Sequence, residues 1–165
     1  MKTRILALAV VALFLAAFAA SAQTGTWTAV GSTGAIDPAS VGISAVFGGT
    51  RLGFSSGTGN TIITRFNVTN TFGGAFNDVT PWTTLELGAV GATAVDIVKA
   101  TLYKVIPCTG ARSAICSVTN TSNVCASCFF PAGTINFGAN LYYVEVTISR
   151  TTTTASPQLS TLRIF

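Results

Sequence analysis

The feature of the sequence that most constrains the fold is a regular alternation of apolar and polar side chains in several short segments. In segment 141–150 (LYYVEVTISR), the even-numbered residues from Tyr142 to Ile148 are apolar or aromatic, and the residues between them are mostly polar. Segments 61–69 and 158–165 alternate in the same way. Because successive side chains of a β-strand point to opposite faces, this period of two predicts strands with one buried face.

Glycine-rich turns and further β-branched segments extend this pattern. Segment 44–54 predicts a hairpin around Gly48-Gly49-Thr50, since glycine supplies the positive φ that a tight turn needs. Segments 38–47 and 89–100 have some helical spacing, but they are rich in Val, Ile or Gly, and a strand or a short turn fits them equally well. We expect further strands near 26–30, 83–90, 96–106, 113–118 and 133–138. The sequence therefore predicts an all-β fold, a single antiparallel β-sandwich of jelly-roll-like type with about 8–10 strands.

The first 22 residues differ from the rest of the chain. Lys2 and Arg4 precede an apolar run over 5–19, and Ala20-Ser21-Ala22 has the small residues that signal peptidase accepts. We interpret residues 1–22 as a secretory signal peptide and residues 23–165 as the sandwich domain. An uncleaved anchor is the alternative, but the apolar run is shorter than the about 20 residues that a helix needs to span a bilayer. We expect a secreted, periplasmic or cell-surface protein with no membrane span after cleavage.

All the cysteines lie close together in the sequence, at Cys108, Cys116, Cys125 and Cys128. A zinc ribbon normally has two C-x2-C pairs, and only one is present here; a redox C-x2-C normally begins a helix, whereas Phe-Phe-Pro follows this one. In a secreted chain, four such thiols favour two structural disulfides. A hairpin across the loop 119–123 would join Cys116 to Cys125 and leave Cys108 to join Cys128. This nested pairing is our hypothesis among the three possible ones.

Composition removes several classes of function. The chain has no histidine, so catalytic Ser-His-Asp and Cys-His sets and imidazole-based metal sites are excluded. Only 8% of the residues are charged, and the basic ones form no cluster, so we expect no nucleic-acid partner. Glycine-rich phosphate loops are also missing. We expect no cofactor, no metal centre and no catalytic residues.

Carboxylates provide the remaining route to catalysis. Glu86 and Glu145 each lie on the polar side of a predicted strand, and two carboxylates facing each other across a cleft can hydrolyse a glycosidic bond. Two solvated glutamates on strand faces are the simpler interpretation, and we predict that the protein is not an enzyme. Asp78 follows Asn77, a pair that fits a turn as well as a calcium site.

Three aromatic residues are candidates for stacking on a ligand: Trp27, Trp82 and Tyr143. An exposed ring can pack against the apolar face of a sugar, which is how a carbohydrate-binding sandwich would use them. Packing in the core is the alternative for each tryptophan.

Three C-terminal segments together resemble the closing strands of secreted bacterial jelly-roll-like sandwich modules: ATLYKV (100–105), NLYYVEVTISR (140–150) and PQLSTLRIF (157–165). In such modules a strand of the LY-V type is followed by a Tyr-Tyr strand and by a last strand with an R-I pair. The resemblance covers the C-terminal part of the chain. It implies the fold and brings no functional residues with it.

We expect a secreted, non-enzymatic module with a structural or adhesive role, which would include self-association into a surface layer or filament. Low charge weakens self-repulsion, and a short strand at 26–30 with glycine on both sides could pair with the sheet edge of another copy. The first alternative is a carbohydrate-binding β-sandwich whose partners are surface glycans. The second is a small outer-membrane β-barrel that ends at Phe165, although Arg163 in the last strand does not suit a lipid-facing surface.

Overall fold

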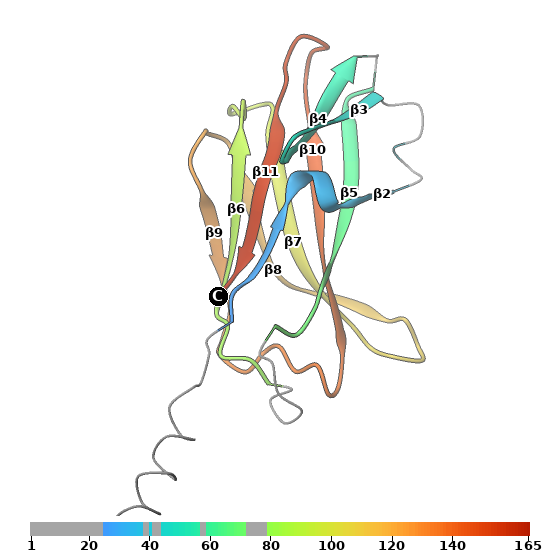
Figure 1. Ribbon diagram of the computed structural model, residues 1–165, viewed down its shortest axis with the longest axis vertical. Helices are drawn as coiled ribbons and strands as arrows, with labels where there is room; N and C mark the ends of the chain where they lie inside the picture. Colours follow the sequence, from blue (N-terminus) through green and yellow to red (C-terminus); the bar gives the residue numbers. More distant parts are fainter. Residues whose placement is uncertain (1–24, 38–39, 41–43, 57–58, 72–78) are drawn as a thin grey trace, which may run out of the picture.

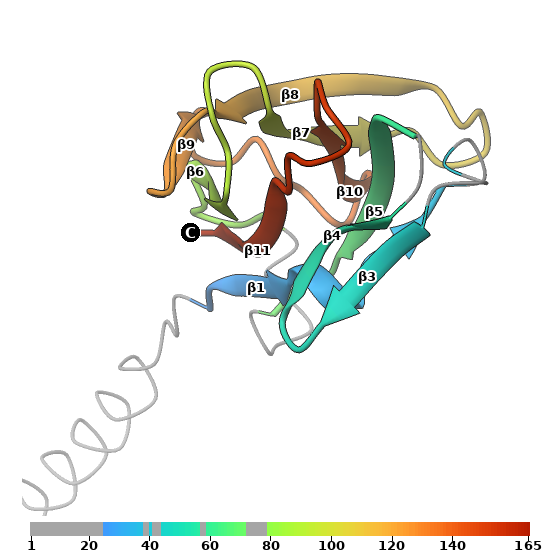
Figure 2. The same ribbon diagram turned by 90° about the horizontal axis from the view of Figure 1, so that it is seen from above.

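Two antiparallel sheets lie face to face in the computed structural model, which describes residues 25–37, 40, 44–56, 59–71 and 79–165 (Figures 1 and 2). The first sheet has the order β3-β4-β11-β6-β9, and β1 also pairs with β11. Its strands are β1 (Trp27–Val30), β3 (Ser44–Gly48), β4 (Arg51–Ser56), β6 (Thr84–Val90), β9 (Ala126–Phe129) and β11 (Gln158–Ile164).

The second sheet has the order β2-β5-β10-β7-β8. Its strands are β2 (Ala35–Ile36), β5 (Thr61–Val68), β7 (Ile97–Val105), β8 (Arg112–Asn120) and β10 (Leu141–Ser149). A single 3-10 turn, η1 (Gly31–Thr33), carries the chain from β1 in the first sheet to β2 in the second. The predicted all-β sandwich is confirmed.

The core lies between the two sheets and consists of the inward-facing residues of both. In β10 the even-numbered residues from Tyr142 to Ile148 are buried, and in β11 Leu162 and Ile164 are buried while Arg163 is exposed. These are the faces that the alternation predicts. The hydroxyl of Tyr142 accepts a hydrogen bond from the backbone N–H of Asn136 (2.8 Å), so this polar atom is satisfied at the edge of the core.

Most of the predicted strands are present, with ends shifted by a few residues. The hairpin at 44–54 forms β3 and β4, and Gly49 has the positive φ (63°) that its turn requires. Segment 89–100 contains no α-helix and leads into β7; in segment 38–47, residues 44–47 belong to β3, while 38–39 and 41–43 lie outside the described residues. The sequence did not predict the short strands β2 and β9.

The strand predicted at 133–138 is wrong. Within this segment only Asn136 pairs, in one isolated bridge with Val79. The backbone N–H of Asn140 donates to the carbonyl of Asn136, and the side chain of Asn136 accepts from the N–H of Gly138, so the segment is folded into turns. Within this segment only Ile135 is deeply buried, and a single buried apolar side chain does not require the backbone to pair as a strand.

The predicted nested disulfides are also wrong. The structure has one disulfide, Cys116–Cys128, and the thiols of Cys108 and Cys125 are free and exposed. The hairpin that would join Cys116 to Cys125 does not form, because β9 pairs with β6 of the first sheet while β8 stays in the second. The disulfide therefore links the two sheets.

A buried carboxylate joins two loops at one end of the sandwich. The backbone N–H of Thr151, after β10, donates to Asp96 Oδ1 (2.7 Å), and the Thr151 hydroxyl donates to the same oxygen (2.8 Å). Thr93 donates to the other oxygen. These hydrogen bonds, the backbone one above all, lower the pKa of Asp96 because they favour its charged form.

No helix among the described residues is long and apolar enough to cross a membrane.

Mapping of the disulfides tests the link between the sheets. Alkylation of the unreduced protein should label Cys108 and Cys125, and proteolysis should then release a peptide that joins Cys116 to Cys128. Removing the bridge with Cys116→Ser and Cys128→Ser should lower the free energy of unfolding by about 3 kcal/mol, while Cys108→Ser should leave it nearly unchanged. A linked peptide containing Cys125 would contradict this pairing.

The Asp96 hydrogen bonds should make stability depend on pH. A carboxyl group with a lowered folded-state pKa contributes stability above its unfolded pKa, and this contribution is lost as the pH falls through the folded-state pKa. Urea unfolding of the protein and of Asp96→Asn should show a clear difference at pH 7 that shrinks below about pH 4. A difference that stays constant down to pH 2.5 would argue against this role for the charge of Asp96.

Candidate functional site

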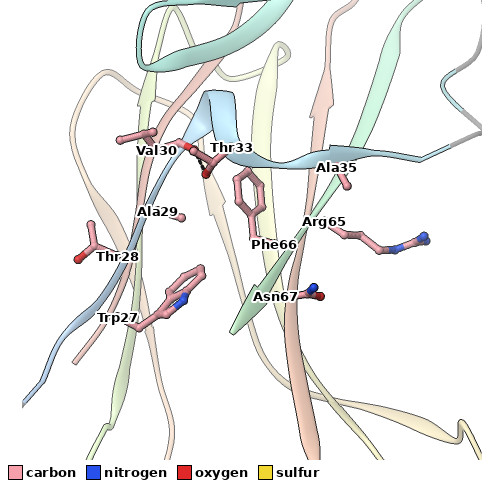
Figure 3. A pocket seen from close by; sticks show the side chains of 9 residues that line it. All are labelled: Trp27, Thr28, Ala29, Val30, Thr33, Ala35, Arg65, Phe66 and Asn67. Carbon is pink, nitrogen blue, oxygen red and sulfur yellow. Dashed lines mark hydrogen bonds between the residues drawn. The ribbon is translucent and has the colours of Figure 1, made fainter. Parts of the chain in front are cut away.

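The described surface contains a cavity of about 520 Å³ between β1 and β5, where an edge of the first sheet faces an edge of the second (Figure 3). We call it the β1–β5 pocket. Its lining residues come from β1, η1, β2 and β5: Trp27, Thr28, Ala29, Val30, Thr33, Ala35, Arg65, Phe66 and Asn67.

The pocket exists because the N-terminal part of the chain divides itself between the two sheets. β1 pairs with β11 through Trp27↔Ile164 to Val30↔Thr161, and η1 then crosses to β2. The crossing lies tightly against the first sheet, since a Cβ at Gly31 would clash with the carbonyl of Leu159 and lie 2.8 Å from the backbone N of Leu52. Figure 3 shows η1 and β2 spanning the upper end of the gap between β1 and β5.

Free strand edges line both sides of the pocket. β1 pairs with β11 on one side, and no described strand pairs with it on the other. β5 pairs with β2 only at Thr64 and Arg65, so its next residues, Phe66 to Val68, have no described partner on that side. Alternate backbone N–H and C=O groups of an edge strand point away from its neighbour, so both edges offer donors and acceptors to a ligand.

Two aromatic side chains form the floor of the pocket. Trp27 (5% exposed) and Phe66 (4% exposed) extend toward each other from opposite sheets, and Figure 3 shows both rings between the strands. Ala29 is on the same face of β1 as Trp27, whereas Thr28 points away. Among the described residues, the indole N–H of Trp27 has no hydrogen-bond partner and remains available as a donor.

The lower end of the pocket is narrowed where the chain before β1 meets the chain after β5. A Cβ at Gly25 would lie 2.8 Å from the carbonyl oxygen of Thr71, so the two backbones are in contact there. The indole N–H of Trp82 donates to the carbonyl of Gly25 (2.6 Å) and fixes this point. Both ends of the pocket are therefore bounded by backbone.

The only charged residue in the lining, Arg65, directs its guanidinium away from the pocket. Figure 3 shows this group pointing from β5 toward the outer side of the second sheet. There its Nε donates to Glu145 Oε2 (2.9 Å), and its Nη1 is paired with Asp37. The hydrogen bond to Glu145, followed by the charge of Asp37, raises the pKa of Arg65. The interior of the pocket thus has aromatic, hydroxyl and backbone groups without a charge.

The structure does not bring the three predicted stacking residues together. Trp82 is 2% exposed and packs edge-on against Phe137, so its predicted stacking role is wrong. Trp27 is buried too, and it contributes the floor of the pocket instead of an exposed platform. Tyr143 lies on the outer face of the second sheet, away from both tryptophans.

Tyr143 is packed against neighbouring side chains on that outer face. Its ring stacks on Tyr103 with the centroids 5.1 Å apart, and the guanidinium of Arg112 lies 5.2 Å from the centroid of Tyr103. Arg112 Nη1 also donates to the Tyr143 hydroxyl (3.0 Å). One face of each ring is therefore covered by the other ring, and Arg112 lies over Tyr103.

The two glutamates considered for hydrolysis are on opposite outer faces of the sandwich. Glu86 lies in β6 of the first sheet and pairs with Arg163 (2.6 Å), and Glu145 lies in β10 of the second and pairs with Arg65. They cannot act together on one glycosidic bond. Asn77 and Asp78 lie outside the described residues, and the described ones contain no group of His, Cys, Asp or Glu suited to a metal ion.

Sequence reasoning did not identify Phe66, Asn67 or Ala29 as site residues. The alternation placed Phe66 on a buried face, which is correct, but it does not show that the strand edge beside Phe66 lacks a partner. The pocket depends on where β2 stops pairing, and a two-residue strand leaves no periodic signal in the sequence.

No protein-family model matches the chain, and no curated protein matches it either. Solved structures with low sequence identity share its fold. The Arthrobacter globiformis T6 isomalto-dextranase complexed with panose is 12% identical, with a TM-score of 0.50, over 86% of this chain and 23% of that one. A Glycosylation Associate Protein (Gap123) complex from Streptococcus agalactiae is 8% identical, with a TM-score of 0.50, over 86% of this chain and 44% of that one.

A third similar structure is a carbohydrate-binding module. The CBM36-1 domain of a multidomain xylanase from the hindgut metagenome of Trinervitermes trinervoides is 12% identical, with a TM-score of 0.47, over 86% of this chain and 97% of that one. This chain therefore spans nearly the whole of that domain but only part of the two larger chains. The two structures with a TM-score of 0.50 support the sandwich fold, and none of the comparisons assigns a residue a role.

Proposed function

We propose that the chain is a non-catalytic module that binds carbohydrate in the β1–β5 pocket. The observation that carries this proposal is the composition of the pocket, which combines an aromatic floor of Trp27 and Phe66 with free backbone groups of two strand edges. A sugar has apolar C–H faces and a ring of hydroxyls, so it needs both kinds of contact at once. The indole N–H of Trp27 adds a directional hydrogen bond.

The size and charge of the pocket support the same class of ligand. A volume of about 520 Å³ falls within the range of about 300–1,000 Å³ that is typical of small-ligand sites. The carboxylates of Glu86 and Glu145 are each held by an arginine and lie on opposite faces of the sandwich, which supports binding without hydrolysis. The isomalto-dextranase structure with panose adds that a fold of this kind occurs in a protein that acts on carbohydrate.

A matched pair of substitutions in β1 tests the pocket. Ala29 faces into it and Thr28 faces away, so Ala29→Leu should fill the pocket while Thr28→Leu leaves it open. On a glycan array, and then by calorimetry with the oligosaccharide that binds best, Ala29→Leu should weaken binding at least tenfold. Thr28→Leu should bind within about twofold of the unaltered protein, because its side chain faces away from the pocket. The tenfold loss expected for Ala29→Leu corresponds to about 1.4 kcal/mol of binding free energy.

Asn67→Ala is a second control, since Asn67 is exposed and lies on the same outer face of β5 as Arg65, opposite Tyr143 in β10. It should bind within about twofold of the unaltered protein, because its side chain does not face into the pocket. Equal affinities for all three variants and the unaltered protein, or the absence of binding to any glycan, would contradict the proposal.

Self-association in a structural or adhesive role is a second candidate, and the free edge of β1 favours it. An edge strand with unpaired backbone groups can add a strand from another copy. Light scattering and negative-stain microscopy of the unreduced protein should then show oligomers or fibres. A monodisperse monomer at high concentration would remove this candidate and leave carbohydrate binding unaffected.

A further inference from the structure

We propose that the β1–β5 pocket recognises the terminal sugar unit of a neutral glycan and does not accommodate an internal unit of a chain. This inference rests on the proposed carbohydrate-binding function. It goes further because it specifies that the end of a glycan binds and that the bound sugar is uncharged. It follows from two properties of the pocket, its closed ends and its uncharged interior.

The pocket is closed at both ends along the direction of the strands. At the upper end, η1 and β2 cross from one sheet to the other (Figure 3). The missing side chain of Gly31 lets this crossing approach β11 and β4 closely. At the lower end, Gly25 contacts the backbone of Thr71 and is held by Trp82. A glycan that ran along the pocket would need a passage through both of these backbone contacts.

The distance between the closed ends is limited. The chain advances six residues from Gly25 to Gly31, and strands rise about 3.3 Å per residue, so the two backbone contacts are at most roughly 20 Å apart. An extended chain of sugars exceeds this length after a few units. A single chain end can enter from the open side, place a ring against Trp27 and Phe66, and leave the rest of the glycan in solvent.

The same closure separates sugar binding from strand addition. An extended peptide that pairs with β1 must continue past both ends of the strand, where the backbones of η1 and Gly25 lie. A compact ring with hydroxyls on all sides can use the free groups of β1 and β5 without such a continuation. The geometry therefore favours a chain end over a strand in this pocket.

The interior of the pocket selects against charged sugars. Its one ionised lining residue, Arg65, has its guanidinium outside, where Glu145 and Asp37 already bind it. A uronic acid, a sulfated sugar or a sialic acid placed on Trp27 and Phe66 would lose hydration of its charge without gaining a cation, which is costly. A neutral hexose or pentose has no such penalty, since its hydroxyls exchange water for free backbone groups of the strand edges and for the indole N–H of Trp27.

An oligosaccharide array with matched series tests this inference. The probes are neutral gluco-, manno-, galacto- and xylo-oligosaccharides of two to six units, and the same chains with a uronic acid at the non-reducing end. We expect that one neutral series binds with affinities that differ less than threefold between two and six units. The free monosaccharide of that series should compete, and the uronic acid should weaken binding at least tenfold.

The possible results separate this inference from the proposed function. Binding that strengthens tenfold or more with each added pair of units, or that is retained with the uronic acid at the end, would overturn terminal recognition of a neutral sugar while carbohydrate binding stands. Binding by neutral chains that Ala29→Leu does not weaken would place the glycan elsewhere and would overturn both. No binding to any probe or array glycan would overturn the proposed function and this inference with it.

Discussion

The structure depends on how the first strands are divided between two sheets that share one core. β1 pairs with β11, β2 pairs with β5, and only the three residues of η1 connect them. The connection is short because Gly31 lets the backbone approach Leu159 and Leu52 at distances that no side chain permits. Below this crossing β1 has no described partner besides β11, and β5 has none besides β10, so the two free edges face each other across the pocket.

The sequence predicts the strands well and the partners of the strands poorly. The alternation in 141–150 and 158–165 identifies both the strands and their buried faces, because burial between two sheets is the direct physical cause of that pattern. The pairing of Cys116 with Cys128 depends on β9 joining β6, a contact between segments about forty residues apart that local periodicity does not encode. The burial of Trp82 likewise depends on distant segments, since it contacts Gly25 and Phe137.

Charge and polarity are distributed differently over the molecule, and this difference guides the functional interpretation. The outer face of the second sheet has paired ions and stacked tyrosines, in which Arg65, Glu145 and Tyr143 are engaged with their neighbours. The β1–β5 pocket has few ionic contacts and several unpaired donors and acceptors beside aromatic rings. Groups that are already paired contribute little to a new ligand, whereas unpaired groups at an aromatic surface gain partners on binding.

The most direct test of this account is a heteronuclear NMR titration with the oligosaccharide that binds best on the array. The chain has two tryptophans, so the spectrum should contain two indole N–H signals, one from Trp27 and one from Trp82. We predict that the Trp27 signal shifts with the ligand, together with backbone amides of β1 and the end of β5, while the Trp82 signal moves little because its N–H is bound to Gly25. Shifts centred on Tyr103 and Tyr143, with Trp27 unchanged, would contradict the account.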